Sequence, residues 1–407
     1  MSGNAKSMFT FNNTYSKHLA DVGTAQSAKA YPDAKWLITS PEVAESLGIL
    51  PEQLDNGSVF NWLTGNEQWP EAAPLAQKYT GHQFGQYNPE LGDGRGILLG
   101  ELETTQGRWD IHIKGAGTTP YSRFGDGKAV LRSCIREFLG SEALHHLGIP
   151  TSRALGVYTT GEVVQRETIE PGAAMIRVAP SHIRFGHFEY AFYHNDKELL
   201  ARLVHYTCDH VLPATAGLKP EMDVQAKAFK LMQYAVISSA EMVAKWQAFG
   251  FCHGVMNTDN MSILGITFDY GPFGFLDEYD PRHICNHSDH SGRYAYDEQP
   301  GVALWDLNVL AHALSPILSK QDLTNILKQY EVTLLAHYSQ LMRGKMGLLH
   351  PQEADRSLLA ELLTLMQQDK SDYTNTWRLL SNIEFGQNEQ LFVDHFINRQ
   401  AARAWLD

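Results

Sequence analysis

The sequence predicts an α+β fold in which a β-rich first part precedes a mostly helical second part. Of its 407 residues, 43% are hydrophobic and only 19% are charged, so the chain has enough apolar material for a large core in two lobes. Short β-favouring runs separated by Gly, Pro or Thr lie within residues 95–180, and long helical stretches follow. We predict that residues 1–190 form an N-terminal extension and a β-rich lobe, and that residues 191–407 form a helical lobe.

Local signals place the elements of the first part. Ser40 is a natural N-cap for a helix over Pro41–Leu47, and Gly48 would close that helix. A longer helix is expected over Ala129–Leu147, because Gly148 follows it. The expected strands are Ile97–Leu102, Trp109–Lys114, Arg153–Tyr158, Glu162–Ile169 and Ala173–Val178.

Helical periodicity dominates the second part of the chain. The expected helices are Asp196–Val211, Val224–Phe249, Val302–Leu318, Asp322–Met342 and Arg356–Gln368. An irregular, strand-favouring stretch, Phe251–Asp280, lies between the second and the third of them. This order is the layout of a two-lobed protein kinase, although layout alone does not identify one.

Composition excludes several classes of partner. The formal net charge is −13, and no cluster of Lys and Arg exists that could follow a nucleic-acid backbone. No apolar segment approaches the roughly 18 residues that a membrane helix needs, and the N-terminus has the features of neither a signal peptide nor a transit peptide. The four cysteines form no CxxC pair, which fits a reducing compartment. We therefore expect a cytoplasmic protein with no nucleic-acid or membrane partner.

Two features suggest phosphate binding. Glycines in the segment Gly92-Asp-Gly94-Arg95-Gly96 would let backbone N–H groups approach phosphate oxygens, although such clusters are also ordinary turns. The segment misses the dinucleotide pattern, and the chain has no Walker A sequence. Lys114 ends an alternating strand, as the phosphate-gripping lysine of kinases does, but a surface lysine on an edge strand would look the same.

A carboxylate falls within the apolar stripe of the helix over Ala129–Leu147. The stripe consists of Val130, Cys134, Glu137, Ser141 and Leu144. A buried carboxylate is costly unless it meets a cation, and Lys114 is the natural candidate. In the alternative, Glu137 lies at the edge of the stripe and reaches solvent.

The strongest feature is His253-Gly-Val-Met-Asn-Thr-Asp259-Asn260, followed by Asp269-Tyr-Gly. Kinases place a catalytic Asp and a metal-binding Asn in a loop that begins with His, and a second metal-binding Asp in a D-F-G segment. Asn260 and Asp269 match the two metal positions. Val255 stands where the kinase base is expected, so Asp259 is the carboxylate left in the loop to act as base. An Asn- and Asp-rich turn is the alternative interpretation.

Several distinctive strings extend this pattern, and together they resemble the selenoprotein O (SelO/YdiU) family from about residue 9 to the end. The strings are Tyr79–Tyr87, Leu91–Gly96, Ile113–Gly127, His253–Met261, Asp269–Phe273 and Cys285–Tyr294. The resemblance implies a pseudokinase fold that transfers AMP from ATP to Ser, Thr or Tyr hydroxyls of proteins and releases pyrophosphate. Bacterial members are also associated with UMP transfer from UTP using Mn²⁺, so the implied metal is Mg²⁺ or Mn²⁺.

The resemblance also implies the roles of individual residues. In the family the nucleotide lies reversed relative to ordinary kinases, so that the α-phosphorus faces the acceptor. Asp259 would be the catalytic base, and Asn260 and Asp269 would be the metal ligands. Glu137 would position Lys114. The residues that would contact the nucleotide are Gly92, Gly94, Arg95, Lys114, Asp126, Gly127, Arg177, Arg184 and Asp269.

Other interpretations stay open at this point. The chain could be a kinase-like phosphotransferase that uses Asp259 as base, or a catalytically silent ATP-binding scaffold. Without the resemblance, Arg177 would be read as a cross-strand ion-pair partner of Glu162 or Glu167. The donor-rich segment from His283 to His290 is interpreted as a structural or substrate-side loop rather than a metal site.

Many members of the resembled family carry a redox motif with Cys or selenocysteine near the C-terminus. The last cysteine here is Cys285, and the sequence stops inside an apparent helix. We therefore expect a truncated chain or a short natural variant, and redox regulation through that motif is not inferred for it.

Overall fold

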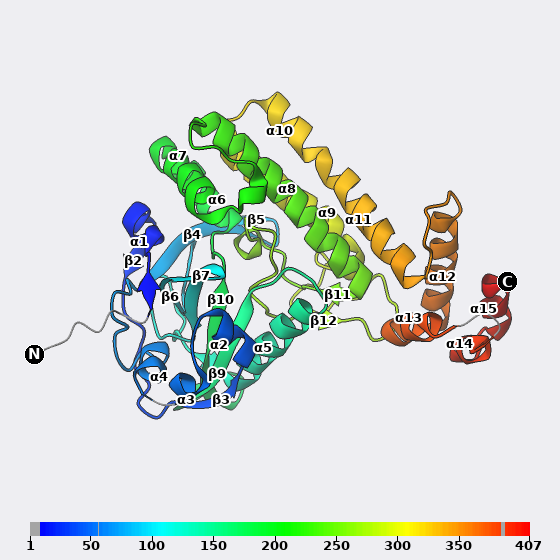
Figure 1. Ribbon diagram of the computed structural model, residues 1–407, viewed down its shortest axis with the longest axis horizontal. Helices are drawn as coiled ribbons and strands as arrows, with labels where there is room; N and C mark the ends of the chain where they lie inside the picture. The colour runs from blue at the N-terminus through cyan, green and yellow to red at the C-terminus, as the bar shows by residue number, and fades with distance from the viewer. Residues whose placement is uncertain (1–8, 56, 384–386) are drawn as a thin grey trace, which may run out of the picture. The chain divides into compact units, whose positions relative to one another are not determined.

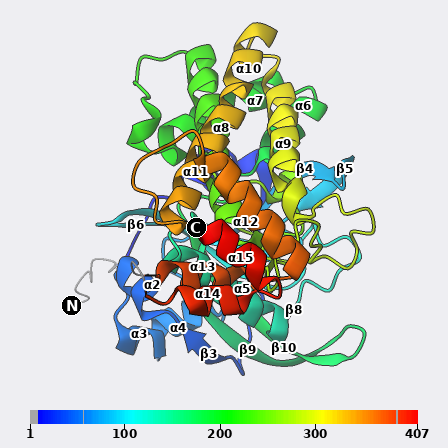
Figure 2. The ribbon, with the colours of Figure 1, turned by 90° about the vertical axis from the view of Figure 1, so that its right-hand side faces the viewer.

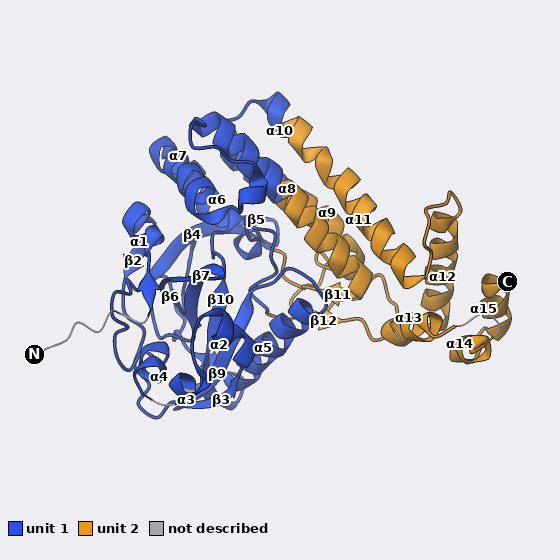
Figure 3. Cartoon of the chain, in the orientation of Figure 1, with its two compact units in different colours: residues 1–235, 257–270, 308–323 blue, residues 236–256, 271–307, 324–407 orange. Residues whose placement is uncertain are grey.

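The computed structural model describes residues 9–55, 57–383 and 387–407, and the chain divides into two compact units (Figure 3). Unit 1 comprises Met1–Ala235, Asn257–Tyr270 and Asn308–Leu323. Unit 2 comprises Val236–Met256, Gly271–Leu307 and Thr324–Asp407. The residue ranges of these units differ from those of the predicted lobes, 1–190 and 191–407. The lobe boundary therefore stays a prediction.

Unit 1 is built on an antiparallel sheet, which has ten strands within the described residues. Its main path runs β2-β4-β6-β7-β10-β9-β3, while β1 pairs with β6, β5 with β4, and β8 with β10. The strands are β1 Thr10–Phe11, β2 Gly23–Ala25, β3 Lys35–Thr39, β4 Leu75–Gln83, β5 Gln86–Gly92, β6 Gly96–Thr104, β7 Gly107–Lys114, β8 Ala129–Val130, β9 Arg153–Gln165 and β10 Ile169–Ala179 (Figure 1).

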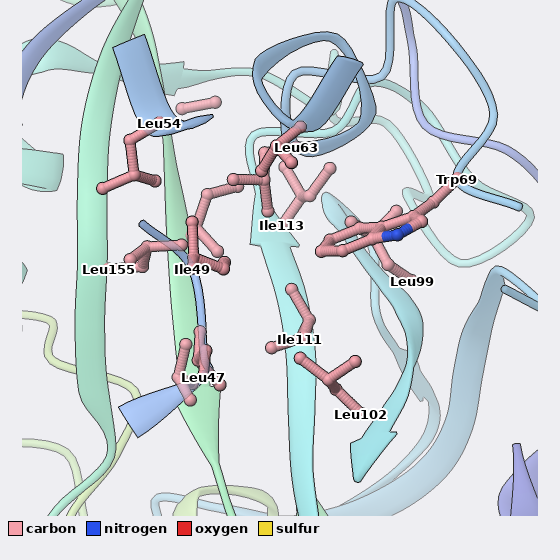
Figure 4. Packing of buried hydrophobic residues seen from close by; sticks show 14 of the residues in the cluster. Leu47, Ile49, Leu54, Leu63, Trp69, Leu99, Leu102, Ile111, Ile113 and Leu155 are labelled. Atoms are coloured by element: carbon pink, nitrogen blue, oxygen red, sulfur yellow. The ribbon is translucent and has the colours of Figure 1, made fainter. Parts of the chain in front are cut away.

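One face of this sheet carries a hydrophobic core of unit 1. Figure 4 shows Ile111 and Ile113 of β7 beside Leu99 and Leu102 of β6, with Trp69 lying over them. Side chains alternate along a strand, so His112, which lies between these isoleucines, and Lys114 at the strand end point to the opposite face. The core therefore fixes the direction of Lys114.

The helices of unit 1 precede, interrupt and follow the sheet. They include α1 Thr14–His18, α2 Pro41–Ser46, α3 Pro51–Asp55, α4 Ser58–Leu63, α5 Leu131–His146, α6 Phe185–Tyr193, α7 Lys197–Tyr206 and the first part of α8 Val224–Phe249. The predicted cap of α2 is confirmed, because Ser40 Oγ accepts a hydrogen bond from the Val43 backbone N–H at 3.4 Å. Helix α5 lies beside β9 and β10 (Figure 1). Its side chains Cys134 and Phe138 belong to a cluster with residues of these strands.

Two predicted boundaries in unit 1 are wrong. The helix expected from Ala129 begins at Leu131, because Ala129 and Val130 pair with β10 as strand β8. The strands expected at Arg153–Tyr158 and Glu162–Ile169 are one strand, β9, which ends at Gln165. Gly161, with φ of 74°, sits in a bulge that the ladder absorbs without a break.

Unit 2 is mostly helical. It contains the second part of α8, part of α9 Gln299–Leu314 and part of α10 Lys320–Leu327. The helices that lie wholly within it are α11 Gln329–Lys345, α12 Asp355–Asp369, α13 Tyr373–Ser381, α14 Glu389–His395 and α15 Arg399–Leu406. It also contains a short pair of strands, β11 Phe251–Cys252 and β12 Gly274–Phe275. The last four helices lie close together (Figure 2) around a core that includes Met366, Trp377 and Phe392.

The predicted helix Val224–Phe249 matches α8 at both ends, and the other predicted helices differ at their boundaries. Asp322–Met342 is two helices, α10 and α11, separated at Lys328. The helix expected at Asp196–Val211 is an α-helix only as far as Tyr206, and a short π-helix follows it over Thr207–Val211. None of the helices in the described part of the chain is long and apolar enough to cross a membrane. The predicted α+β class with kinase-like organisation is confirmed, and its β-rich and helical parts follow each other as expected.

Candidate active site

A buried ion network joins β7, α5 and β10 in unit 1. Glu137 of α5 is 0% exposed, and its Oε2 accepts a hydrogen bond from Lys114 Nζ. Its Oε1 accepts from Nε and Nη2 of Arg177 at 2.8 and 2.5 Å. Burial raises the pKa of Glu137, but Arg177 and Lys114 more than offset this and hold the pKa below its usual range. The structure thus places Lys114 in the interior and pairs it with Glu137.

Strand register explains why Arg177 reaches this network. Arg177 of β10 lies opposite His112 of β7, so Arg177 and Lys114 project from the same face of the sheet. The interpretation of Arg177 as a partner of Glu162 or Glu167 is wrong, because its carboxylate partners are Glu137 and Asp269, with Nη1 of Arg177 2.8 Å from Oδ1 of Asp269.

Arg184 contacts both parts of the predicted catalytic segment, the loop of Asp259 and the segment that begins at Asp269. Its guanidinium lies over the rings of Tyr79 and Phe268, 4.7 and 4.5 Å from their centroids. It donates to the backbone carbonyl of Asp259 at 2.6 Å and also pairs with the Asp269 carboxylate. Because the Arg184 side chain is only 2% exposed, packing holds it in a single direction. It therefore ties Asp259 to Asp269.

Asp269 forms ion pairs with both arginines and is held ionised. Burial raises the pKa of Asp269, but Arg184 and Arg177 hold it well below its usual range. The backbone of Asp269 has φ of 60°, a left-handed conformation that is uncommon for a residue other than Gly. Such strain is often kept at functional sites, where surrounding contacts hold it.

Asp259 lies in a short 3₁₀ turn, Thr258–Asn260, and is 7% exposed. Its Oδ2 accepts from Gln83 Nε2 at 3.2 Å, and its Oδ1 is buried without a hydrogen-bond partner among the described residues. Burial raises the pKa of Asp259 to about 7, although Arg184 opposes the rise. A carboxyl group that titrates near neutral pH suits a general base.

The glycine-rich segment is shaped by packing. Asp93 is buried and accepts from the Gln77 backbone N–H at 3.1 Å. A Cβ on Gly92 would lie 2.6 Å from the ring of Tyr121, and one on Gly94 would lie 2.8 Å from the carbonyl oxygen of Tyr121. Close approach to Tyr121 therefore accounts for the two glycines. Their contact with a nucleotide, and that of the exposed Arg95, stays a prediction.

Asp126 and Gly127 lie in the loop that follows β7. Asp126 accepts from Arg166 at 2.9 and 3.1 Å, and this hydrogen bonding lowers its pKa to about 2. Gly127 has φ of 69°, and a Cβ there would collide with the backbone of Gly117. These contacts order the loop, and the predicted nucleotide contacts of both residues stay predictions.

The segment from His283 to His290 has, in part, a clear structural role in unit 2. Asp289 is 3% exposed and accepts from the backbone N–H groups of Arg293 and Tyr294 at 3.0 and 2.7 Å. Its carboxylate therefore shapes the turn that follows it, which agrees with the interpretation of this segment as a structural loop.

Sequence reasoning missed Gln83, Tyr79 and Phe268 as residues of this site. Their signal was present, because Gln83 and Tyr79 belong to the distinctive string Tyr79–Tyr87, and Phe268 precedes Asp269. That string was given no chemical role, because Gln83 and Asp259 are separated in the sequence by about the length of a whole domain.

Close packing around Asp259 leads to a stability prediction at Gly186. A Cβ on Gly186 would collide with the backbone carbonyl oxygen of Thr80, in the strand that contacts Asp259. We expect Gly186→Ala to lower the free energy of unfolding by about 1–3 kcal/mol, because backbone atoms must move. Gly344→Ala is the control, since its Cβ would meet nothing within 4 Å, and it should stabilise the chain by up to about 1 kcal/mol. Urea unfolding of the two variants measures both effects, and equal stability of the two would contradict the packing argument.

Comparison with known proteins covers nearly the whole chain. A family model described as protein adenylyltransferase SelO matches residues 7–405. A protein nucleotidyltransferase YdiU of Vibrio vulnificus (strain YJ016) is 52% identical over 376 residues, which are 92% of this chain and 75% of that protein. The corresponding protein of Pseudoalteromonas atlantica is 48% identical over 398 residues, or 97% of this chain and 82% of that protein. A third, from Erwinia tasmaniensis, is 49% identical over 400 residues, or 98% and 82%.

The matched range contains each residue of the site described above, from Tyr79 to Asp269. Identities of 48% and 52% over more than nine-tenths of the chain cannot arise from shared composition. This chain therefore belongs to the SelO family of protein adenylyltransferases.

Proposed function

We propose that this chain transfers AMP from ATP to Ser, Thr or Tyr hydroxyls of protein substrates and releases pyrophosphate. One observation carries the proposal. Glu137 and Asp269 are each paired with basic side chains, whereas Asp259 has no ion pair within the described residues and has a pKa near 7. Asp259 is thus the carboxylate of the site that is suited to accept a proton.

We propose that these side chains take part in the reaction as follows. The acceptor hydroxyl passes its proton to Asp259 as its oxygen bonds to the α-phosphorus. The bond from that phosphorus to the β-phosphate oxygen breaks, and pyrophosphate leaves. We propose that Lys114, Arg177 and Arg184 stabilise the charge that develops on the phosphates, with ATP bound in the reversed direction. Val255 has no ionisable group, which supports a pseudokinase arrangement with a replaced base.

The residues present fit a divalent metal ion. Asn260 and Asp269 offer an amide oxygen and a carboxylate that is held ionised, and oxygen ligands are those that Mg²⁺ and Mn²⁺ prefer. When bound, the ion would supply positive charge to the phosphates. Asp269 pairs with Arg177 and Arg184, and we propose that phosphate binding draws these arginines away from it.

Transfer with ATP labelled at different phosphates tests the proposed function. We expect label from α-labelled ATP to become attached to an acceptor protein, with none from γ-labelled ATP. The reason is that only the α-phosphoryl group stays with the acceptor in AMP transfer. Label from the γ position alone would instead establish a kinase-like phosphotransferase, and no transfer with either label would favour an ATP-binding scaffold. Running α-labelled UTP beside ATP, with Mg²⁺ or Mn²⁺, distinguishes AMP from UMP transfer.

A further inference from the structure

The end of strand β4 holds the loop that carries Asp259. Three consecutive residues at this end each donate a hydrogen bond to a different residue of the loop. The bonds run from the His82 backbone N–H to Thr258 Oγ1 at 2.7 Å, from Gln83 Nε2 to Asp259 Oδ2 at 3.2 Å, and from the Phe84 backbone N–H to Asn257 Oδ1 at 3.3 Å. One short segment thus contacts three successive loop residues, and one of these contacts reaches the carboxylate itself.

The local backbone makes this approach possible. Phe84 and Gly85, with φ of 50° and 78°, form a two-residue turn of the kind that closes tight hairpins, and β5 returns at Gln86. Gln83 is therefore the last residue of β4, with its side chain direction set by the ladder. A Cβ on Gly81 would lie 3.0 Å from the backbone nitrogen of Asp259, so Gly at this position allows the strand to come close.

The amide of Gln83 is oriented by Asn88. Asn88 Nδ2 donates to Gln83 Oε1 at 3.3 Å, and Asn88 Oδ1 accepts from the Glu90 backbone N–H at 3.0 Å. Because Oε1 of Gln83 is the acceptor, its NH₂ group faces the Asp259 carboxylate. The hydrogen bonds thus run in one direction, from Asn88 through Gln83 to Asp259.

We propose that Gln83, oriented by Asn88, is a positioning residue for the Asp259 carboxylate during transfer, an inference that rests on the proposed function. Oδ1 of Asp259 is buried against Gly81, and Oδ2 takes the Gln83 bond. An oxygen of a carboxylate has a second lone-pair direction, and in this proposal that of Oδ2 takes the proton of the acceptor hydroxyl. The proton moves from this hydroxyl to Oδ2 while the acceptor oxygen bonds to the α-phosphorus and pyrophosphate leaves.

Two substitutions at Asn88 separate orientation from structural support. Asn88→Asp keeps the shape and the bond to Glu90, but it replaces the donor to Gln83 with an acceptor. The Gln83 amide then turns its NH₂ toward the introduced carboxylate and its oxygen toward Asp259, and this oxygen repels the Asp259 carboxylate. Asn88→Ala loses both bonds and leaves the Gln83 amide free. We expect Asn88→Asp to lower kcat by about 10-fold and Asn88→Ala by about 3-fold, with the KM for ATP unchanged in both.

A substitution at Gln83 measures the contact directly. Gln83→Leu removes the donor at similar size and should lower kcat by about 30-fold, because the base loses its fixed direction. Nucleotide affinity, measured by equilibrium binding, should stay within about twofold of the parent. Gln86→Leu is the matched control, because Gln86 lies opposite Gln83 in the same hairpin and is exposed. In the Gln83→Leu background, Asn88→Asp should have no further effect.

Each outcome decides between distinct ideas. If Asn88→Ala lowers kcat as much as Asn88→Asp or more, Asn88 is only a structural support. The proposal that Asn88 orients the Gln83 amide is then refuted. A Gln83→Leu variant that keeps the kcat of Gln86→Leu also refutes the proposal. If Gln83→Leu does not fold, the comparison of Asn88→Asp with Asn88→Ala tests the proposal by itself, because both variants keep Gln83. A parent chain that transfers no α-label contradicts the proposed function first, and this inference falls with it.

Discussion

Replacing Asp259 by Asn is expected to lower the kcat of nucleotidyl transfer by about 10³-fold. Asn keeps the shape of the side chain, but a neutral amide cannot take the proton of the acceptor hydroxyl. Nucleotide affinity should stay within about twofold of the parent, because the phosphates are assigned to Lys114, Arg177 and Arg184. Initial rates with α-labelled ATP, together with equilibrium nucleotide binding, measure the two effects separately. Parent-like rates in Asp259→Asn would remove Asp259 from the role of base.

The same substitution should stabilise the protein at pH 8 when metal and nucleotide are absent. Burial raises the pKa of Asp259 from 3.8 to about 7, so the folded state favours the neutral carboxyl. The resulting cost is absent below pH 3.8, grows as the pH rises to about 7, and is constant above that. At about 1.4 kcal/mol per pH unit it amounts to at most about 4 kcal/mol.

Unfolding in urea at two pH values checks this gain. Asp259→Asn should raise the free energy of unfolding clearly at pH 8 and much less at about pH 4, where the parent carboxyl is neutral in the folded state and only about half ionised in the unfolded one. Asp21→Asn serves as the control, because Asp21 pairs with Arg202 on the surface and should contribute less than about 1 kcal/mol. A variant that is less stable than the parent at pH 8 would show that Asp259 supports the fold rather than burdening it.

Replacing Glu137 by Gln is expected to have the largest combined effect on stability and activity. Lys114 and Arg177 would then share a neutral amide in a site where Glu137 is 0% exposed and Arg177 is 2% exposed. Breaking such a buried pair costs about 3–5 kcal/mol, because charge is left without compensation. Since Glu137 also holds Lys114 and Arg177 in place, kcat/KM should fall by about 10²-fold.

An exposed pair in the same unit provides the matched control for Glu137. Glu170 pairs with Arg132 at 2.7 Å, and the Arg132 side chain is 67% exposed. Glu170→Gln should therefore change the free energy of unfolding by less than about 1 kcal/mol and leave transfer unchanged. Thermal unfolding and α-label transfer compare the two variants. Similar effects at both positions would mean that the buried network contributes no more than a surface pair.

The sequence predicted well those features that depend on local order. The stripe on α5 placed Glu137 inside, the alternation along β7 placed Lys114 on one face, and both positions agree with the structure. Helix α8 was predicted at both ends because apolar residues repeat along it without interruption. In contrast, the β4–β5 hairpin and helix α6 were not predicted. Their residues become buried only through contacts with distant segments, which no local periodicity reveals.

What the sequence alone determined about this protein is its chemistry. The order of Lys114, Glu137, Asp259 and Asp269, the absence of a carboxylate at Val255, and the distinctive strings together specify the family. The order of the motifs and the types of their residues can be read directly from the sequence, because the chemistry requires particular side chains. Tertiary structure decided which charges pair. In the folded chain Arg177 forms ion pairs with Glu137 and Asp269 instead of with Glu162 or Glu167. Gln83 donates a hydrogen bond to Asp259. Such pairs depend on strand register and on the approach of backbones far apart in the chain, and these are settled only when the whole sheet packs.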